Sequence, residues 1–213
     1  MASEDPDGRA PGDHWMQTTL ETRRLTFRPL TWDDLPFFTA LHGDPLVARY
    51  LITGKPRSAA ETREWLATEM AWYREDGAGH MGAVLKATGQ LVGRCGLQWF
   101  EVEVGDLARP RAFFGRRSAP PGVGTVPQLE VGYTFHPGLW GQGLATEAAQ
   151  FMRDQGFARG EERIIAVIRP ENAASIRVAE KTGLSHGGDL ELAGQRFRRY
   201  ELTRAEWERR LLR

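Results

Sequence analysis

The sequence predicts an α/β fold, of the α+β kind, built on a mixed sheet that is largely antiparallel at first. Strand-like and helix-like segments follow the order strand, helices, three strands, helix, strand, helix, strands. A glycine-rich turn joins the strand-like run 129–135 to the helix-like run 145–157. The next run, Arg163–Ile168, is β-branched and apolar enough for a central strand. Residues 129–168 therefore predict one parallel β-α-β crossover.

Capping boxes predict where three helices begin, because a Ser or Thr and an acidic residue three positions later satisfy the free N–H groups of a first turn. They are Thr31 with Asp34, Ser58 with Glu61, and Thr203 with Glu206. Apolar periodicity and turn residues predict the other elements. These are strands over 20–30, 80–86, 91–104, 188–192 and 197–202, a short helix from 44, and a helix over 174–181.

The composition predicts a protein without bulk attraction to nucleic acid or membranes. Its 213 residues suffice for one α/β domain, and 28 basic residues balance 28 acidic ones. No apolar run is long enough to span a bilayer, and no signal-peptide layout is present, so we expect a cytoplasmic location. The single cysteine, Cys95, is expected to be a small buried strand residue, and the histidines lack metal-ligand spacing.

Two segments lack any periodic pattern. Residues 1–17 are rich in Asp, Gly and Pro and predict a disordered tail ahead of a domain over 18–213. Residues 105–127 are dense in Gly, Pro and Arg and predict a long inserted loop. Such a loop is either a mobile insertion or a functional element, here a lid or a subunit contact.

The glycine-rich turn is the clearest candidate for a binding site. It reads Leu139-Trp140-Gly141-Gln142-Gly143-Leu144-Ala145-Thr146-Glu147. A turn of this kind between a strand and a helix presents bare N–H groups and the positive end of a helix dipole, which together bind phosphate. A dinucleotide site is the alternative. It fits less well, because Thr146 replaces the third glycine of that fingerprint and Arg169 stands where an acidic residue is expected.

Three motifs carry a family resemblance. They are Glu130-Val131-Gly132-Tyr133, then 139–148 with the turn, then 171–184, which reads ENAASIRVAEKTGL; the closing YELTR segment at 200–204 with Trp207 adds to them. Over about residues 18–211 the chain resembles the GCN5-related N-acetyltransferase (GNAT) superfamily, in its RimJ/RimL-like branch of ribosomal-protein N-terminal acetyltransferases. The resemblance implies a GNAT fold of about seven strands, with a splayed cleft between the family's fourth and fifth strands and helices on both sides. It also implies acetyl-CoA as the co-substrate and no metal.

The resemblance implies a set of residues that bind acetyl-CoA. Backbone N–H groups of 141–146 would hold the pyrophosphate, although Trp140 stands where the family usually has Gln or Arg. Thr134 and Phe135 would lend backbone groups to the pantetheine arm, and Asn172 would bond that arm or orient the next catalytic group, besides capping a helix. The full predicted set is Thr134, Phe135, Trp140, Gly141, Gln142, Gly143, Leu144, Ala145, Thr146, Asn172 and Ser175.

Glu130 and Ser175 are the candidate catalytic residues. Glu130 alternates with Val131 on the strand and neighbours Gly132, which suggests open space around its carboxylate. An attacking amine has a pKa of ~8 or ~10 and must lose a proton, so a nearby carboxylate would serve as the base. The alternative is an ion pair between Glu130 and an arginine of the 105–127 loop.

A second catalytic group is the acid that protonates the departing thiolate. Many superfamily members place a Tyr seven residues after the Asn, but Ala179 occupies that position here. The branch instead offers the hydroxyl of Ser175, whose alternative role is that of an ordinary serine in a first helical turn. His136, before Pro137, is expected to be a turn residue rather than a catalytic one.

The residues and the resemblance together predict an acetyl-CoA-dependent N-acetyltransferase. A primary amine, on a protein N-terminus or a small molecule, would attack the thioester directly in a ternary complex. Backbone N–H groups near Phe135 would polarise the thioester carbonyl. Two alternatives remain, a non-catalytic coenzyme A sensor and a transferase for another acyl-CoA. The acceptor and a homodimer are left open.

Overall fold

The computed structural model describes residues 19–105 and 107–212. Within them the strands form one nine-stranded mixed sheet in the order β1-β2-β3-β4-β5-β8-β9-β7-β6. Strand β4 also pairs with β6, so the ladder closes on itself through β5, β8, β9 and β7. The strands are β1 (Leu20–Glu21), β2 (Leu25–Arg28), β3 (Gly79–Leu85), β4 (Gln90–Glu103), β5 (Arg111–Phe114), β6 (Thr125–Phe135), β7 (Arg163–Ile168), β8 (Ser185–Leu192) and β9 (Gln195–Thr203).

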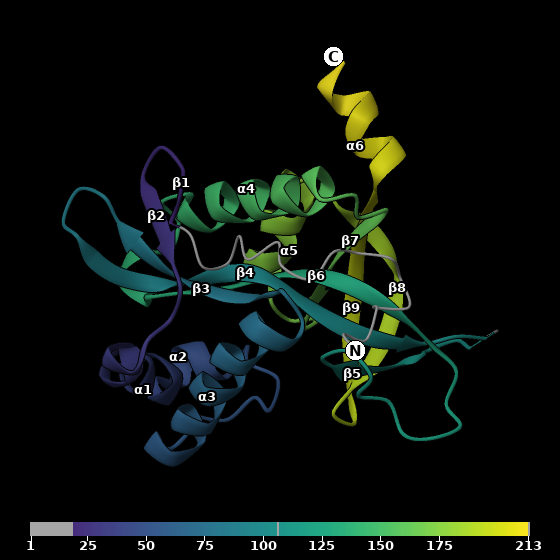
Figure 1. The fold of residues 1–213 in the computed structure, drawn as a ribbon, viewed down its shortest axis with the longest axis horizontal. Coiled ribbons are helices and arrows are strands. Elements are labelled where there is room, and N and C mark those ends of the chain that lie inside the picture. The colour runs from purple at the N-terminus through teal and green to yellow at the C-terminus, as the bar shows by residue number, and fades with distance from the viewer. Residues whose placement is uncertain (1–18, 106, 213) are drawn as a thin grey trace, which may run out of the picture.

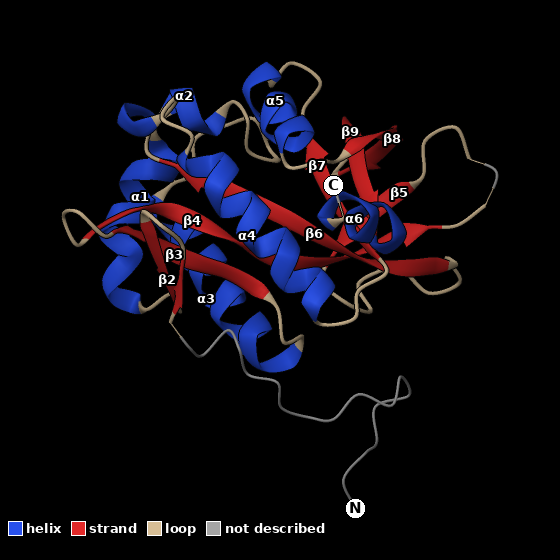
Figure 2. Ribbon diagram, turned by 90° about the horizontal axis from the view of Figure 1, so that it is seen from above, coloured by secondary structure: helices blue, strands red, loops and turns tan. Residues whose placement is uncertain are grey.

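Helices cover both faces of this sheet (Figure 1). They are α1 (Leu35–Gly43), α2 (Pro45–Ala48), α3 (Ala59–Glu75), α4 (Leu144–Ala158), α5 (Ala173–Lys181) and α6 (Arg204–Leu211). Helices α1, α2 and α3 lie on one side, and α4 and α5 lie on the other, with α4 running across β4 and β6 (Figure 2). Within the described residues, no helix is long and apolar enough to cross a membrane.

The predicted helix starts are confirmed. The capping boxes at Ser58 and Thr203 make both of their reciprocal hydrogen bonds. At Thr31 the backbone N–H donates to Asp34 at 2.9 Å, and the box begins a short 3-10 turn, Trp32–Asp34, that leads into α1. The first predicted strand, 20–30, is wrong in its middle, because the chain turns between β1 and β2. The reason is local. The Thr22 hydroxyl accepts a hydrogen bond from the Leu25 N–H at 3.1 Å, so this N–H bonds to a side chain instead of to a neighbouring strand.

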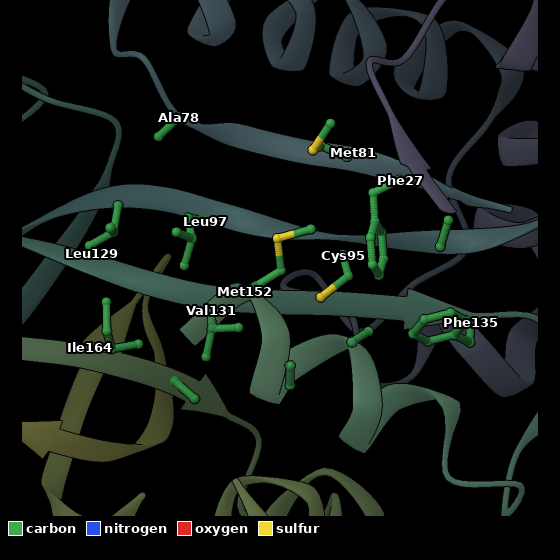
Figure 3. Close-up of a cluster of buried hydrophobic side chains, with 14 of the residues drawn as sticks. Phe27, Ala78, Met81, Cys95, Leu97, Leu129, Val131, Phe135, Met152 and Ile164 are labelled. Carbon is green, nitrogen blue, oxygen red and sulfur yellow. The ribbon is translucent and has the colours of Figure 1, made fainter. Parts of the chain in front are cut away.

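The main core includes buried side chains of α1 and α3 as well as α4, and one part of it lies between the sheet and α4. Figure 3 shows Phe27, Met81, Cys95, Val131 and Met152 in this part of the core, and all are buried. Burying one such side chain contributes about 1.5–3 kcal/mol. Cys95 is completely buried, as predicted, and burial raises the pKa of its thiol far above the usual range.

The 105–127 segment is only partly the loop that was predicted. Strand β5 lies inside it, pairing antiparallel with β4 and parallel with β8, and β6 begins at Thr125. Ala112 of β5 packs with Phe100 and Phe197 in a second small core, and this packing stabilises the strand. Four residues between Gly- and Pro-rich turns carry too short a pattern to predict it. The predicted tail, residues 1–17, lies outside the described residues.

Candidate active site

A cleft opens where β6 and β7 separate. The two strands pair in parallel only at Leu129 with Ile164 and at Glu130 with Ile165. Strand β4 holds the other edge of β6 along its length, so beyond Glu130 the edge facing β7 has no strand partner in the part of the chain that the structure describes. A cavity of about 360 Å³ fills this opening, walled by β6, the turn at 139–146, β7 and α5. The splayed cleft that the family resemblance implies corresponds to this opening between β6 and β7.

The glycine turn forms one end of the cavity. Gly141 and Gly143 have φ angles of +77° and +78°, a backbone region that L side chains rarely adopt. Helix α4 begins at Leu144 with Gly143 as its N-cap, and among the described residues no side-chain cap bonds its first N–H groups. These free donors at the positive end of a helix suit a phosphate, so the residues present fit the pyrophosphate of coenzyme A.

An ion pair anchors this turn to the N-terminal strands. The Arg24 guanidinium bonds Glu147 of α4 through Nε at 2.6 Å and donates through Nη1 to the Gln142 carbonyl at 2.8 Å. Glu147 also accepts from the Arg24 backbone N–H and the Thr22 hydroxyl. The pair holds the backbone of the turn while its N–H groups stay free for a ligand.

Trp140 explains how the turn manages without the polar residue usual in the family. Its indole Nε1 donates to the Phe135 carbonyl at 2.8 Å, which ties the turn to the end of β6. The ring is 43% exposed and borders the cavity. Gln142 behaves differently, because its side chain donates to the Gly138 carbonyl and lies outside the cavity wall.

Glu130 lies at the apex of the cleft, where β6 and β7 part. Its carboxylate is buried, and Oε1 accepts the Val167 N–H of β7 at 3.4 Å. Burial raises the pKa of Glu130 to about 7, and the Val167 N–H and the nearby Arg94 charge act against that rise. The alternative ion pair with a 105–127 arginine is wrong, because the arginine that influences Glu130 is Arg94 of β4.

His80 lies near Glu130 and is hydrogen-bonded to Glu69, and the sequence alone predicted a role for neither residue. Strands β3, β4 and β6 bring His80, Gly96 and Gly132 into one row. His80 Nδ1 lies 2.8 Å from Glu69 Oε1, and both side chains are almost completely buried. No local pattern signals this contact, because it forms only when the three strands pair side by side.

Asn172 and Ser175 meet the cavity from α5. The Asn172 side chain is buried and accepts the Ser175 N–H at 3.1 Å, so it caps the helix as predicted. The Tyr133 phenol of β6 lies near Ser175. Burial raises its pKa far above the usual range, and the Ser175 hydroxyl opposes this rise. Tyr133 is therefore a second hydroxyl at the cleft, which the sequence had suggested only as a member of a motif.

Almost the whole predicted site lines this one cavity. Thr134 and Phe135 of β6, Leu144, Ala145 and Thr146 of α4, and both candidate catalytic residues do so, and Gln142 does not. His136 lies exposed in a turn, where its Nδ1 accepts from the Gly138 N–H. Within 19–105 and 107–212, no three His, Cys, Asp or Glu side chains gather to hold a metal ion.

The family is decided by a sequence model. The model of the acetyltransferase (GNAT) domain matches residues 24–185. The chain belongs to the GNAT acetyltransferase family. The uncharacterized protein YkkB of Bacillus subtilis is 31% identical over 172 residues, covering 80% of this chain and 87% of that protein. The FsC-acetyl coenzyme A-N(2)-transacetylase of Aspergillus fumigatus is 28% identical, covering 91% and 79% of the two chains.

Solved structures of GNAT proteins share the fold. An acetyltransferase from Agrobacterium tumefaciens aligns with a TM-score of 0.65 and 24% identity, covering 87% of this chain and 94% of that one. The RimL ribosomal L7/L12 alpha-N-protein acetyltransferase in complex with coenzyme A aligns with a TM-score of 0.61 and 16% identity, covering 87% and 98%. The family and its fold identify this chain as an N-acyltransferase enzyme.

Proposed function

We propose that this protein transfers the acetyl group of acetyl-CoA to a primary amine, with Glu130 as the base. The observation that carries the proposal is the position of this carboxyl at the apex of the cleft, buried, with a pKa of about 7. A base with such a pKa is half ionised at neutral pH, where it can still accept the proton of an attacking amine. The acceptor would be a protein N-terminus, as for RimL-like enzymes, or a small-molecule amine.

The other residues of the cleft have roles that follow from their chemistry. Acetyl-CoA supplies the activated thioester. The backbone N–H groups of 141–146 bind its pyrophosphate, and backbone groups of Thr134 and Phe135 align its pantetheine arm. Asn172 holds the start of α5, and Ser175, with Tyr133 beside it, offers a hydroxyl proton to the leaving thiolate. A thiol has a pKa of about 8.5, so this last contribution is modest.

The test is acetyl transfer to a panel of amines by wild type and Glu130→Gln. We expect the variant to bind coenzyme A normally and to lose about 10²–10⁴-fold in kcat/KM, the usual contribution of a positioned base. Glu101→Gln is the matched control, because Glu101 is another buried glutamate on the neighbouring β4 and lies outside the cavity. Equal rates in wild type and Glu130→Gln would remove Glu130 from the mechanism. Binding without any turnover by wild type would favour a coenzyme A sensor.

A further inference from the structure

The contacts of His80 with Glu69 favour one tautomer of the imidazole ring, the one with the hydrogen on Nδ1. Its backbone N–H donates to Glu69 Oε2 at 2.9 Å, and its Nδ1 lies 2.8 Å from Glu69 Oε1. Burial alone would raise the pKa of Glu69. The charge interaction and hydrogen bonds with His80 outweigh the effect of burial, so the pKa of Glu69 lies below its usual range. An ionised carboxylate can only accept, so Nδ1 carries the hydrogen and Nε2 has a free lone pair.

His80 Nε2 and the Glu130 carboxyl both border the space above Gly132. A Cβ placed on Gly132 would lie 2.6 Å from His80 Nε2 and 3.0 Å from Glu130 Oε2. Because both atoms lie close to this one Cβ position, His80 Nε2 and Glu130 Oε2 are at most about 6 Å apart. A direct hydrogen bond or one bridging water can span that distance. Nε2 is buried and has no hydrogen-bond partner among the described residues. A buried acceptor without a donor costs free energy unless a donor reaches it in some state of the enzyme.

We propose that Glu69 and His80 position the catalytic carboxyl: Glu69 fixes the Nδ1–H form of His80, and Nε2 then accepts a hydrogen bond from protonated Glu130, directly or through one water. The inference rests on the proposed function. The amine N–H proton moves to a Glu130 oxygen, and the resulting carboxylic acid O–H donates to Nε2. The proton passes to solvent after the product leaves, and no bond of Glu69 or His80 breaks. Gly132 is required because any side chain there would fill the space between the two groups.

The surrounding charges are compatible with this role. The side-chain groups that act on the pKa of His80 or Glu130 are Glu69 of α3, Arg94 and Gln98 of β4, and Arg57 before α3; the Tyr73 hydroxyl of α3 donates to the His80 backbone carbonyl. Burial first, and then Arg94, lower the pKa of His80, while Glu69 opposes the change. The imidazole is therefore neutral at physiological pH. An acceptor for the protonated acid stabilises that form, so His80 contributes to the raised pKa of Glu130.

Two substitutions of His80 separate positioning from packing. His80→Asn keeps an N–H near the Nδ1 position for Glu69 but offers nothing at the Nε2 position. His80→Gln places a carbonyl acceptor near the Nε2 position. The acid limb is the fall of kcat/KM at low pH that follows protonation of Glu130. In His80→Asn we expect this limb to move to a lower pH by about one unit, because one hydrogen bond to the protonated acid is lost and its free energy corresponds to about that shift in pKa. We expect His80→Gln to stay near wild type.

His42→Asn is the matched control. His42 is also a buried neutral histidine, packed on Trp65 at 4.5 Å, but it lies away from Gly132. We expect its acid limb to stay at the wild-type pH. An acid limb that is equal in wild type and folded His80→Asn would overturn the positioning proposal while leaving the proposed transferase intact. Absence of transfer by wild type would instead refute the transferase itself.

A measurement on wild type covers the case in which His80→Asn does not fold. Nitrogen-15 NMR of the histidine rings reports which ring nitrogen carries the hydrogen. We expect the neutral Nδ1–H form of His80 throughout the pH range of the acid limb. An Nε2–H form or an imidazolium at neutral pH would overturn the proposal.

Discussion

The ionisation of Glu130 leads to a quantitative prediction for the pH dependence of acetyl transfer. The reaction needs the carboxylate, so protonation of Glu130 removes activity as the pH falls. With a pKa of about 7, about one tenth of the enzyme carries the carboxylate at pH 6, about half at pH 7 and about nine tenths at pH 8. We therefore expect kcat/KM to rise about tenfold between pH 6 and 8. A solvent-exposed glutamate, with a pKa of about 4.3, would give a flat profile over the same range.

The assay must separate Glu130 from the amine, since the acceptor also ionises. An α-amine has a pKa of about 8 and a lysine-like amine one of about 10. With two such acceptors, the limb that belongs to the enzyme stays at the same pH and the limb of the amine moves. Glu130→Gln should lose the enzyme limb, and Glu101→Gln should keep it. A wild-type profile that is flat from pH 6 to 8 after correction for the amine would refute the assignment of Glu130 as a buried base. The same limb in wild type and Glu130→Gln would also refute it.

Three further predictions concern the turn, the acid and the core. Gly143→Val forces a branched side chain into a left-handed backbone at the start of α4, so coenzyme A should bind at least about tenfold more weakly by calorimetry; unchanged affinity would contradict the phosphate site. Ser175→Ala should lower kcat less than about tenfold, because a thiolate leaves readily; a loss near that of Glu130→Gln would make Ser175 essential. Gly96→Ala would bring a Cβ within 2.6 Å of His80 Cα and should destabilise the fold by about 1–3 kcal/mol in thermal unfolding; an unchanged Tm would contradict this packing.

Much of the fold follows from signals that lie close together in the chain. The capping boxes at Ser58 and Thr203 act within one helical turn, so four residues are enough to predict each helix start. The apolar run of β7 identifies a central strand with the same bounds that the structure shows. Strand β5 could not be predicted, because its stability comes from β4, β8 and the second small core.

In the candidate site, too, features made by neighbouring residues were predictable and features made by distant residues were not. The glycine turn was recognisable because left-handed backbone and free N–H groups at a helix start depend on neighbouring residues. The Arg24–Glu147 clamp was not, since its partners are far apart in sequence and the hydrogen bonds between them leave no local pattern. The sequence also suggested open space around Glu130, while the structure shows a buried carboxyl at the apex of the cleft.

By itself, the sequence predicted a stretch of backbone suited to a phosphate and the side chains suited to acid–base chemistry, because these properties belong to short segments. Only the tertiary structure decided how acidic Glu130 is and what adjoins it. A pKa depends on burial and on charges within a few ångströms, and here those come from other strands and helices, with Arg94 on β4 and Glu69 on α3. The pairing of β3, β4 and β6 is what brings His80 to that carboxyl.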